Sequence, residues 1–226
     1  MTIIKKILRL LKTNAAYYLR DYYHEAYYGQ DYYLDNVFRQ HKKLETYLEL
    51  LELDNKQPLL TDVNISFSDN QNFHENEVNF FKLKYGKPNY SISNSYPFGE
   101  IKKLFYRVHI GTHKVKMELN FFENSLFLYN YTFSQIKNSN EKIEIQNLLK
   151  KKYQIDEKYN LLPDNYYIID RNQSVIVLSD NVNFTINYIL NTNSNLYNQM
   201  KNALKKEIGQ DEHLADRNKQ EIYKRL

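Results

Sequence analysis

The stretch from residue 103 to residue 134 constrains the fold most, because apolar and polar residues alternate along it with the period of a β-strand. Gly111-Thr112 interrupts the alternation and is typical of a two-residue hairpin loop, which pairs Ile110 with His113. The same register sets three apolar pairs on one face: Val108 with Val115, Tyr106 with Met117, and Leu104 with Leu119. The stretch therefore predicts an antiparallel hairpin with one core-facing side.

A second turn is expected at Glu123-Asn124-Ser125, where a three-residue loop opposes Phe122 with Leu126. A two-residue loop would move the aromatic residues beyond it to the opposite face, so we predict the longer loop. It keeps three pairs on the core-facing side: Phe121 with Phe127, Leu119 with Tyr129, and Met117 with Tyr131. The result is a three-strand meander whose other, solvated face carries Arg107, His109, Lys114, Lys116 and Glu118.

The rest of the body is interpreted from the spacing of its apolar residues. This spacing predicts helices at 74–85, 139–153 and 195–208, and strands at 63–67, 89–94, 166–170, 174–179 and 183–190. We predict an α+β fold in which an N-terminal helical arm precedes an antiparallel meander-type sheet packed on one side by helices. The order of elements also hints at a duplicated α-β-β-β unit. The expected division is an arm at 1–54, an α+β domain at 60–208 and a charged helical tail at 209–226.

The first helix of the arm is amphipathic. On a helical wheel its apolar residues fall within about 160°, and its basic residues fill the opposite side. The apolar set is Ile3, Ile4, Ile7, Leu8, Leu10 and Leu11, and the basic set is Lys5, Lys6, Arg9 and Lys12. A second helix is expected at about 35–53, with Val37, Leu44, Leu48 and Leu51 facing the core.

Tyrosine pairs recur every five residues in the arm, at Tyr17-Tyr18, Tyr22-Tyr23, Tyr27-Tyr28 and Tyr32-Tyr33. A period of five matches neither a helix, with about 3.6 residues per turn, nor a strand, so the pairs cannot all share one face. On the helical wheel, Tyr23 and Tyr27 lie well off the apolar face and Tyr17 lies at its border. Two interpretations stay open: the arm packs on the chain's own sheet, or its outward tyrosines and basic residues contact a partner.

Composition excludes several classes of function. The chain has no cysteine, which excludes disulfides, thiolate metal sites and thiol catalysis and fits a reducing compartment, so we expect a cytoplasmic protein. With five glycines it carries no phosphate-binding loop or dinucleotide motif, and we expect no cofactor. The formal charge of +4 is too small to indicate nucleic acid, and no apolar run is long enough to span a membrane.

Three groups of polar residues have simpler interpretations than catalysis or metal binding. His109 and His113 have the spacing of a helical metal site, but the interval spans the predicted hairpin loop. The other groups are His74 with Glu75 and Glu77, which suit a helix start, and Asp21 with His24 and Glu25, which lack a positioned nucleophile. We therefore predict neither a metal site nor catalytic residues.

We expect a non-enzymatic protein–protein interaction module, of the immunity or adaptor kind, that contacts a protein partner or a second copy of itself through the arm. The candidate contact residues are Tyr17, Tyr23, Tyr27, Lys5, Lys6 and Arg9. Two alternatives are a peripheral membrane protein that uses the basic amphipathic helix, and an enzyme of unrecognised type. Nucleic acid is not an expected partner.

Overall fold

The computed structural model describes residues 43–67, 77–133, 136, 138–162, 166–180 and 183–206. The chain divides into two compact units, Met1–Lys43 and Leu44–Leu226, and the described residues after Lys43 belong to the second. The predicted basic helix, the tyrosine pairs and the tail at 209–226 lie outside the described residues. The sheet and the helices packed on it belong to the second unit.

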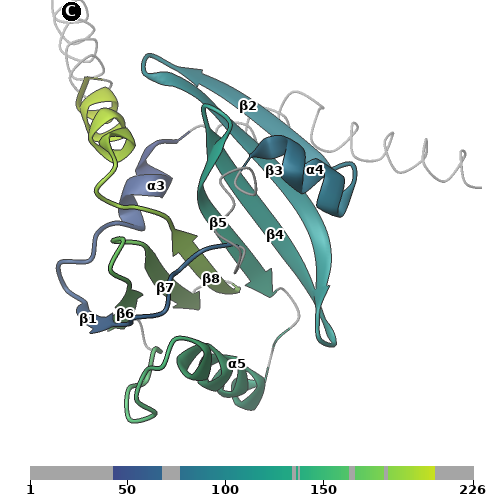
Figure 1. Ribbon diagram of the computed structural model, residues 1–226, viewed down its shortest axis with the longest axis vertical. Helices are drawn as coiled ribbons and strands as arrows, with labels where there is room; N and C mark the ends of the chain where they lie inside the picture. The colour runs from purple at the N-terminus through teal and green to yellow at the C-terminus, as the bar shows by residue number, and fades with distance from the viewer. Residues whose placement is uncertain are drawn as a thin grey trace, which may run out of the picture. The chain divides into compact units, whose positions relative to one another are not determined.

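An eight-stranded sheet forms the centre of this unit, in the order β1-β6-β7-β8-β5-β4-β3-β2 (Figure 1). Its strands are β1 (Gln57–Leu60), β2 (Tyr90–Tyr96), β3 (Gly99–Ile110), β4 (His113–Phe122), β5 (Ser125–Phe133), β6 (Tyr166–Ile169), β7 (Val175–Asp180) and β8 (Phe184–Ile189). Neighbouring strands are antiparallel except β1 and β6, which run parallel. The predicted α+β fold with a mainly antiparallel sheet is confirmed.

Within the described ranges the helices are α3 (Glu45–Glu49), α4 (Val78–Tyr85), α5 (Ser139–Lys152) and a further helix over 195–206. α4 and α5 contribute Phe81 and Leu149 to one core cluster, whereas α3 and the last helix contribute Tyr47 and Met200 to another. Successive residues of β7 alternate between the two clusters, so the clusters lie on opposite faces of the sheet. The prediction that helices pack on one side is wrong, because β7 is apolar on both faces and each face requires cover.

The duplicated α-β-β-β unit stays a prediction. Among the residues that the structure describes, four strands lie between α4 and α5, and three strands follow α5. The two halves therefore differ in strand number, and the first half contains one strand more than the proposed unit.

The β3–β4 hairpin has the predicted register. Ile110 pairs with His113 around Gly111-Thr112, and the three predicted apolar pairs are directly opposed. Gly111 has a φ of +57°, a left-handed conformation that glycine adopts without strain. The predicted solvated face is exposed at Arg107, His109, Lys114 and Lys116, and Glu118 is half-buried. Burial of one face therefore specified the register correctly.

The β4–β5 turn corrects the prediction of a three-residue loop. The turn consists of Glu123 and Asn124, which both have positive φ (+46° and +72°) as in a tight hairpin turn. A β-bulge beyond the turn then shifts the register by one residue, so Leu119 still opposes Tyr129 as predicted. The prediction assumed regular pairing, and the bulge lets a short turn coexist with an aromatic core face.

The strand predicted at 63–67 is wrong, and the preceding segment forms β1 instead. Gln57–Leu60 pairs with β6, whereas 63–67 forms neither helix nor strand although Ile65 is buried. The Asp170 carboxylate accepts hydrogen bonds from the backbone N–H of Ile65 at 2.7 Å and of Ser174 at 2.8 Å. The buried N–H of Ile65 is thereby satisfied without a neighbouring strand.

Candidate functional site

α5 leaves two of its large apolar side chains exposed to solvent. Its first turn is capped by Asn138, whose side-chain oxygen accepts a hydrogen bond from the N–H of Asn140 at 3.0 Å. Leu149 is buried against the sheet, but Leu148 is 61% exposed and Ile143 is 51% exposed. A helix on a protein surface ordinarily turns such residues toward the core. Part of the apolar side of α5 is therefore left uncovered by the described residues.

The C-terminal end of α5 is held by buried polar contacts. The ammonium of Lys150 donates hydrogen bonds to the backbone carbonyls of Glu157 at 2.9 Å and Tyr159 at 3.1 Å. Tyr153, which follows the helix, is fully buried, and its carbonyl accepts a hydrogen bond from the Thr61 hydroxyl at 2.6 Å. These contacts attach the end of α5 to the sheet domain, and they limit how far the helix can tilt to bury its remaining apolar residues.

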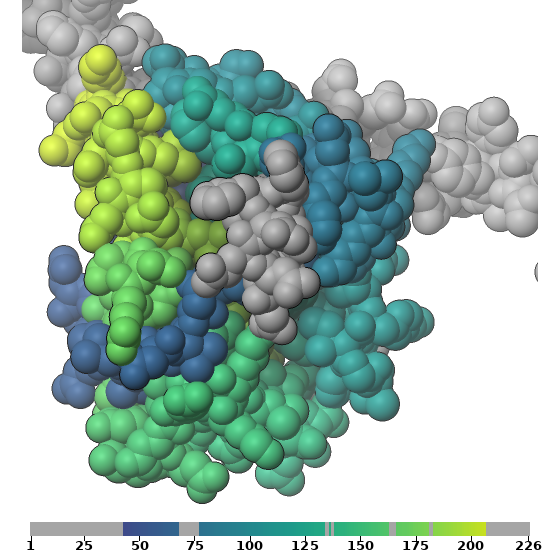
Figure 2. Space-filling view, in the orientation of Figure 1, coloured from purple at the N-terminus to yellow at the C-terminus, as the bar shows by residue number. Residues whose placement is uncertain are grey.

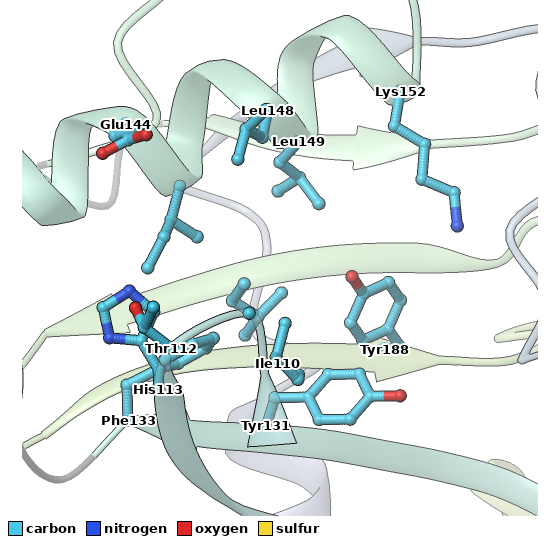
Figure 3. Close-up of a pocket in the computed structure, with 13 residues that line it drawn as sticks. Ile110, Thr112, His113, Tyr131, Phe133, Glu144, Leu148, Leu149, Lys152 and Tyr188 are labelled. Atoms are coloured by element: carbon cyan, nitrogen blue, oxygen red, sulfur yellow. The ribbon is translucent and has the colours of Figure 1, made fainter. Parts of the chain in front are cut away.

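A pocket of about 600 Å³ lies between α5 and the sheet (Figure 3). Figure 2 shows the green surface of α5 beside the teal surface of the strands at the lower end of the domain. The lining residues are Ile110, Gly111, Thr112 and His113 of the β3–β4 hairpin end, Tyr131 and Phe133 of β5, Ile186 and Tyr188 of β8, and Glu144, Ile145, Leu148, Leu149 and Lys152 of α5. The volume falls in the range of small-molecule pockets, roughly 300–1,000 Å³.

The pocket is apolar in its middle and polar at its two ends. Figure 3 shows Lys152 reaching from the end of α5 over the side where the hydroxyls of Tyr131 and Tyr188 lie. Glu144 and His113 lie at the opposite end. The walls between these ends are formed by aliphatic and aromatic side chains from both layers. The arrangement suits an elongated molecule with an apolar body and a polar group at one or both ends.

Two tyrosines place hydroxyl groups at the Lys152 end. Tyr188 is 8% exposed, and its ring lies edge-on to the ring of Tyr131 with 6.0 Å between centroids. Burial raises the pKa of Tyr188 well above its usual value, and the nearby tyrosines Tyr153 and Tyr131 raise it further. Burial raises the pKa of Tyr131 as well, followed by the effects of Tyr85 and Tyr153. Both phenols therefore stay protonated at neutral pH and can donate hydrogen bonds.

Within the described residues, neither hydroxyl is hydrogen-bonded to another protein group. Two buried tyrosines of the same sheet domain differ in this respect: the Tyr129 hydroxyl donates to the Ser66 carbonyl at 3.1 Å, and the Tyr197 hydroxyl donates to the Phe127 carbonyl at 3.3 Å. Buried polar groups nearly always have a partner. The hydroxyls of Tyr131 and Tyr188 are thus available to a molecule in the pocket.

The two histidines of the hairpin do not share a ligand site. The His113 ring lies edge-on to Phe133 at 6.0 Å and lines the pocket, whereas His109 is exposed and pairs with Lys114 in the sheet. Register parity sets these two histidines on opposite faces of the hairpin. Across the described ranges, no three His, Cys, Asp or Glu side chains gather in a way that could hold a metal ion.

A second group of buried polar side chains lies on the opposite face of the sheet. The Tyr47 hydroxyl donates to Asn120 at 3.1 Å, and the Lys103 ammonium lies 4.7 Å from the Tyr47 ring centroid and 3.9 Å from a Glu118 carboxylate oxygen. Burial lowers the pKa of Lys103, partly offset by Glu118. The members of this group satisfy one another and attach α3 to the sheet. We therefore assign it a structural role.

The residues predicted to contact a partner lie outside the described residues: Tyr17, Tyr23, Tyr27, Lys5, Lys6 and Arg9. The same is true of His74, Glu75, Asp21, His24 and Glu25, whereas Glu77 is the residue that precedes α4. The interaction hypothesis for the arm therefore stays a prediction.

The pocket residues were not recognised from the sequence. Tyr131 lies on the predicted core face of the meander, and Ile145, Leu148 and Leu149 fall within the helix predicted at 139–153. The available signal is the wide distribution of apolar residues around that helix, which includes Ile143 and exceeds what one contact with a sheet can bury. Spacing alone could not show which of these residues would be left uncovered.

No protein-family model, no curated protein and no solved structure matches this chain. None of the helices in the described ranges has the length and apolar character needed to cross a membrane. The function is therefore argued from the geometry of the pocket.

Proposed function

We propose that the protein is a non-enzymatic binding protein whose sheet domain holds a small, mainly apolar molecule in the pocket between α5 and the sheet. The observation that carries this proposal is the pocket of about 600 Å³, with apolar walls and polar groups at its ends. Such a combination is typical of ligand sites, where the apolar walls supply affinity and the few polar groups fix orientation.

The exposed apolar residues around the pocket support a bound molecule rather than imperfect packing. Ile110 at the hairpin end is 39% exposed, and Leu148 on the facing helix is 61% exposed. Covering apolar surface is favourable by about 25 cal/mol per Å². A ligand between these two side chains would remove both from water, which α5 cannot do alone because its C-terminal end is attached at Lys150 and Tyr153.

The protein-partner hypothesis for the arm is compatible with this proposal and rests on the sequence alone. The outward pair Tyr23 and Tyr27 and the basic helix remain its candidate contacts. The arm would then recruit a protein or a second copy, while the sheet domain binds its own small ligand. The two activities reside in separate compact units and can be tested separately.

A titration with the neutral, apolar dye Nile red tests the pocket in the full-length chain. We expect saturable binding to the wild type, and about tenfold weaker binding to a Leu148→Gln variant, equivalent to about 1.4 kcal/mol. Leu83→Gln is the matched control, because Leu83 is 87% exposed on α4 and does not line the pocket. Absence of saturable binding, or equal losses in the two variants, would overturn the proposal.

A further inference from the structure

The geometry points to a specific class of ligand: a single-chain amphiphile whose anionic head group sits among Lys152, Tyr131 and Tyr188 and whose apolar chain runs toward Ile110 and Phe133. This inference rests on the proposed function, since it needs the pocket to bind a molecule. It adds the charge and the orientation of that molecule.

Lys152 supplies the charge at the head-group end. It is the last residue of α5, and its ammonium lies 5.5 Å from the centroid of the Tyr153 ring. No carboxylate of a described residue forms an ion pair with it. The neighbouring lysines are not equivalent, because Lys150 is committed to two backbone carbonyls and Lys151 does not line the pocket. Lys152 is thus the cation of this helical turn that a ligand in the pocket can reach.

Tyr131 and Tyr188 supply hydrogen-bond donors beside this charge. Tyr188 is more than nine-tenths buried, and neither hydroxyl has a hydrogen bond to a described protein group. A protonated phenol can donate to a carboxylate oxygen, and hydrogen bonds to charged acceptors are roughly twice as strong as neutral ones. Two phenols and one ammonium at the same end of the pocket therefore favour a negatively charged group.

The sign of the charge follows from where the acids lie. Glu144, the acidic residue of the pocket lining, lies on α5 at the opposite end, across the pocket from His113 (Figure 3). A cationic head group would be repelled by Lys152 at one end of the pocket. It would therefore have to bind at the other end, near the β3–β4 turn. An anionic head group at the Lys152 end avoids Glu144, and its chain can then follow the apolar walls.

The apolar walls define the chain end of the ligand. Leu149 is 7% exposed on the helix side, and Ile186 and Phe133 are each 4% exposed on the sheet side. These side chains carry no hydrogen-bonding groups, so a flexible hydrocarbon chain fits them better than a polar molecule such as a sugar or a nucleotide. The expected ligand is therefore a fatty-acid-like molecule rather than a small polar anion.

Three probes that share a ten-carbon chain separate this inference from the proposed function: decanoate, decanol and decylamine, titrated by calorimetry at neutral pH below their aggregation concentrations. We expect the wild type to bind decanoate at least about tenfold more tightly than the other two. Lys152→Gln should remove the preference for decanoate over decanol, because it removes the charge that favours the anionic probe. Lys151→Gln is the matched control and should keep the preference.

Tyr188→Phe keeps the ring and removes the hydroxyl, so it should lower the affinity for decanoate several-fold and lower the affinity for decanol by a smaller factor, because the hydrogen bond to a neutral acceptor is weaker. Equal binding of decanoate and decanol by the wild type, or a preference that survives Lys152→Gln, would overturn the head-group assignment while the pocket proposal stands. If none of the three probes binds and Nile red also fails, the pocket proposal itself is wrong.

Discussion

Tyr129 and Tyr188 stack face to face across β5 and β8, with 4.4 Å between ring centroids and 7° between ring planes. The two residues are directly opposed in the sheet, and the Tyr129 hydroxyl donates to the Ser66 carbonyl. The stack fixes the orientation of the Tyr188 ring, so that its hydroxyl reaches the pocket while its ring completes the core. One aromatic pair thus serves both the core and the candidate site.

Removing the Tyr188 ring should destabilise the domain, whereas removing its hydroxyl should not. We expect Tyr188→Ala to lower the free energy of unfolding by about 3–5 kcal/mol, because it leaves a cavity beside Tyr129. Tyr188→Phe preserves the stack and should change that free energy by less than about 1 kcal/mol. Urea denaturation of the two variants measures both values, and similar losses would show that the hydroxyl has a structural partner.

The Asp170 carboxylate should be essential for the conformation of 61–67. Asp170→Ala leaves the buried N–H groups of Ile65 and Ser174 without an acceptor, which should cost about 2–4 kcal/mol. Asp62→Ala is the control. Asp62 forms a 2.8 Å ion pair with Arg171, but the Asp62 side chain is 76% exposed, so the pair contributes little to stability. The control should lose under about 1 kcal/mol in the same denaturation experiment. Equal losses would contradict the role given to Asp170.

Lys103 should make the stability of the domain depend on alkaline pH. Burial lowers its pKa below the usual 10.5, so the unfolded chain binds the Lys103 proton more tightly than the folded protein does. The penalty for burying the charge is fully present below the folded pKa and disappears as pH rises toward 10.5. The free energy of unfolding of the wild type should therefore rise, relative to Lys103→Met, over that window.

At neutral pH we expect Lys103→Met to change stability by less than about 1 kcal/mol, because the lost contact with Glu118 is offset by the removed desolvation cost. Denaturation of both proteins from neutral to alkaline pH gives the difference curve. Measurements should stay below pH 10, because above it Tyr47 ionises in the unfolded chain and lowers the free energy of unfolding. Burial raises the pKa of folded Tyr47 well above 10.0, so the folded protein does not lose this proton in the same range. A flat difference curve would contradict the assignment.

The β4–β5 turn should be improved by a residue that tolerates positive φ. Glu123 has a φ of +46°, which is costly for most residues but common for asparagine. We expect Glu123→Asn to raise the free energy of unfolding by about 0.5–1 kcal/mol and Glu123→Val to lower it by at least about 1 kcal/mol. Thermal denaturation checks both. Identical melting temperatures for Glu123→Asn and Glu123→Val would contradict the positive φ assigned to Glu123.

The arm hypothesis predicts an effect of its two outward tyrosines. The double variant Tyr23→Ala, Tyr27→Ala should lose a protein partner in a pull-down or change the mass measured by light scattering, because large aromatic contacts dominate interface energies. Nile red binding by the same variant should be unchanged, since the pocket belongs to the other compact unit. An unchanged mass together with an unchanged set of partners would remove the interface hypothesis.

Hydrophobic periodicity predicted the strands around Gly111, α5 and the three strands of the second half, because the repeat of a strand or a helix is a local property of the chain. It failed where the structure departs from regular pairing. The bulge in β5 shifts the register by one residue, so a two-residue turn still leaves Tyr129 and Tyr131 on the core face. The Asp170 carboxylate accepts the hydrogen bond from the Ile65 N–H that a neighbouring strand would otherwise accept. Neither compensation leaves a periodic signal.

The sequence by itself determined which residues of the β3–β4 hairpin face the core, and it placed Tyr131 of β5 on that side. It wrongly placed Phe127 on the face of Phe121, because the bulge turns Phe127 toward the other core cluster. Only the tertiary structure decided that α5 leaves Leu148 uncovered and that Lys152 lies at the same end of the pocket as the hydroxyls of Tyr131 and Tyr188. The pocket joins segments that are brought together by the strand order and by the attachment of the end of α5 at Lys150 and Tyr153. The physical reason is that periodicity reports which side of an element is buried, whereas a cavity depends on how closely two elements approach.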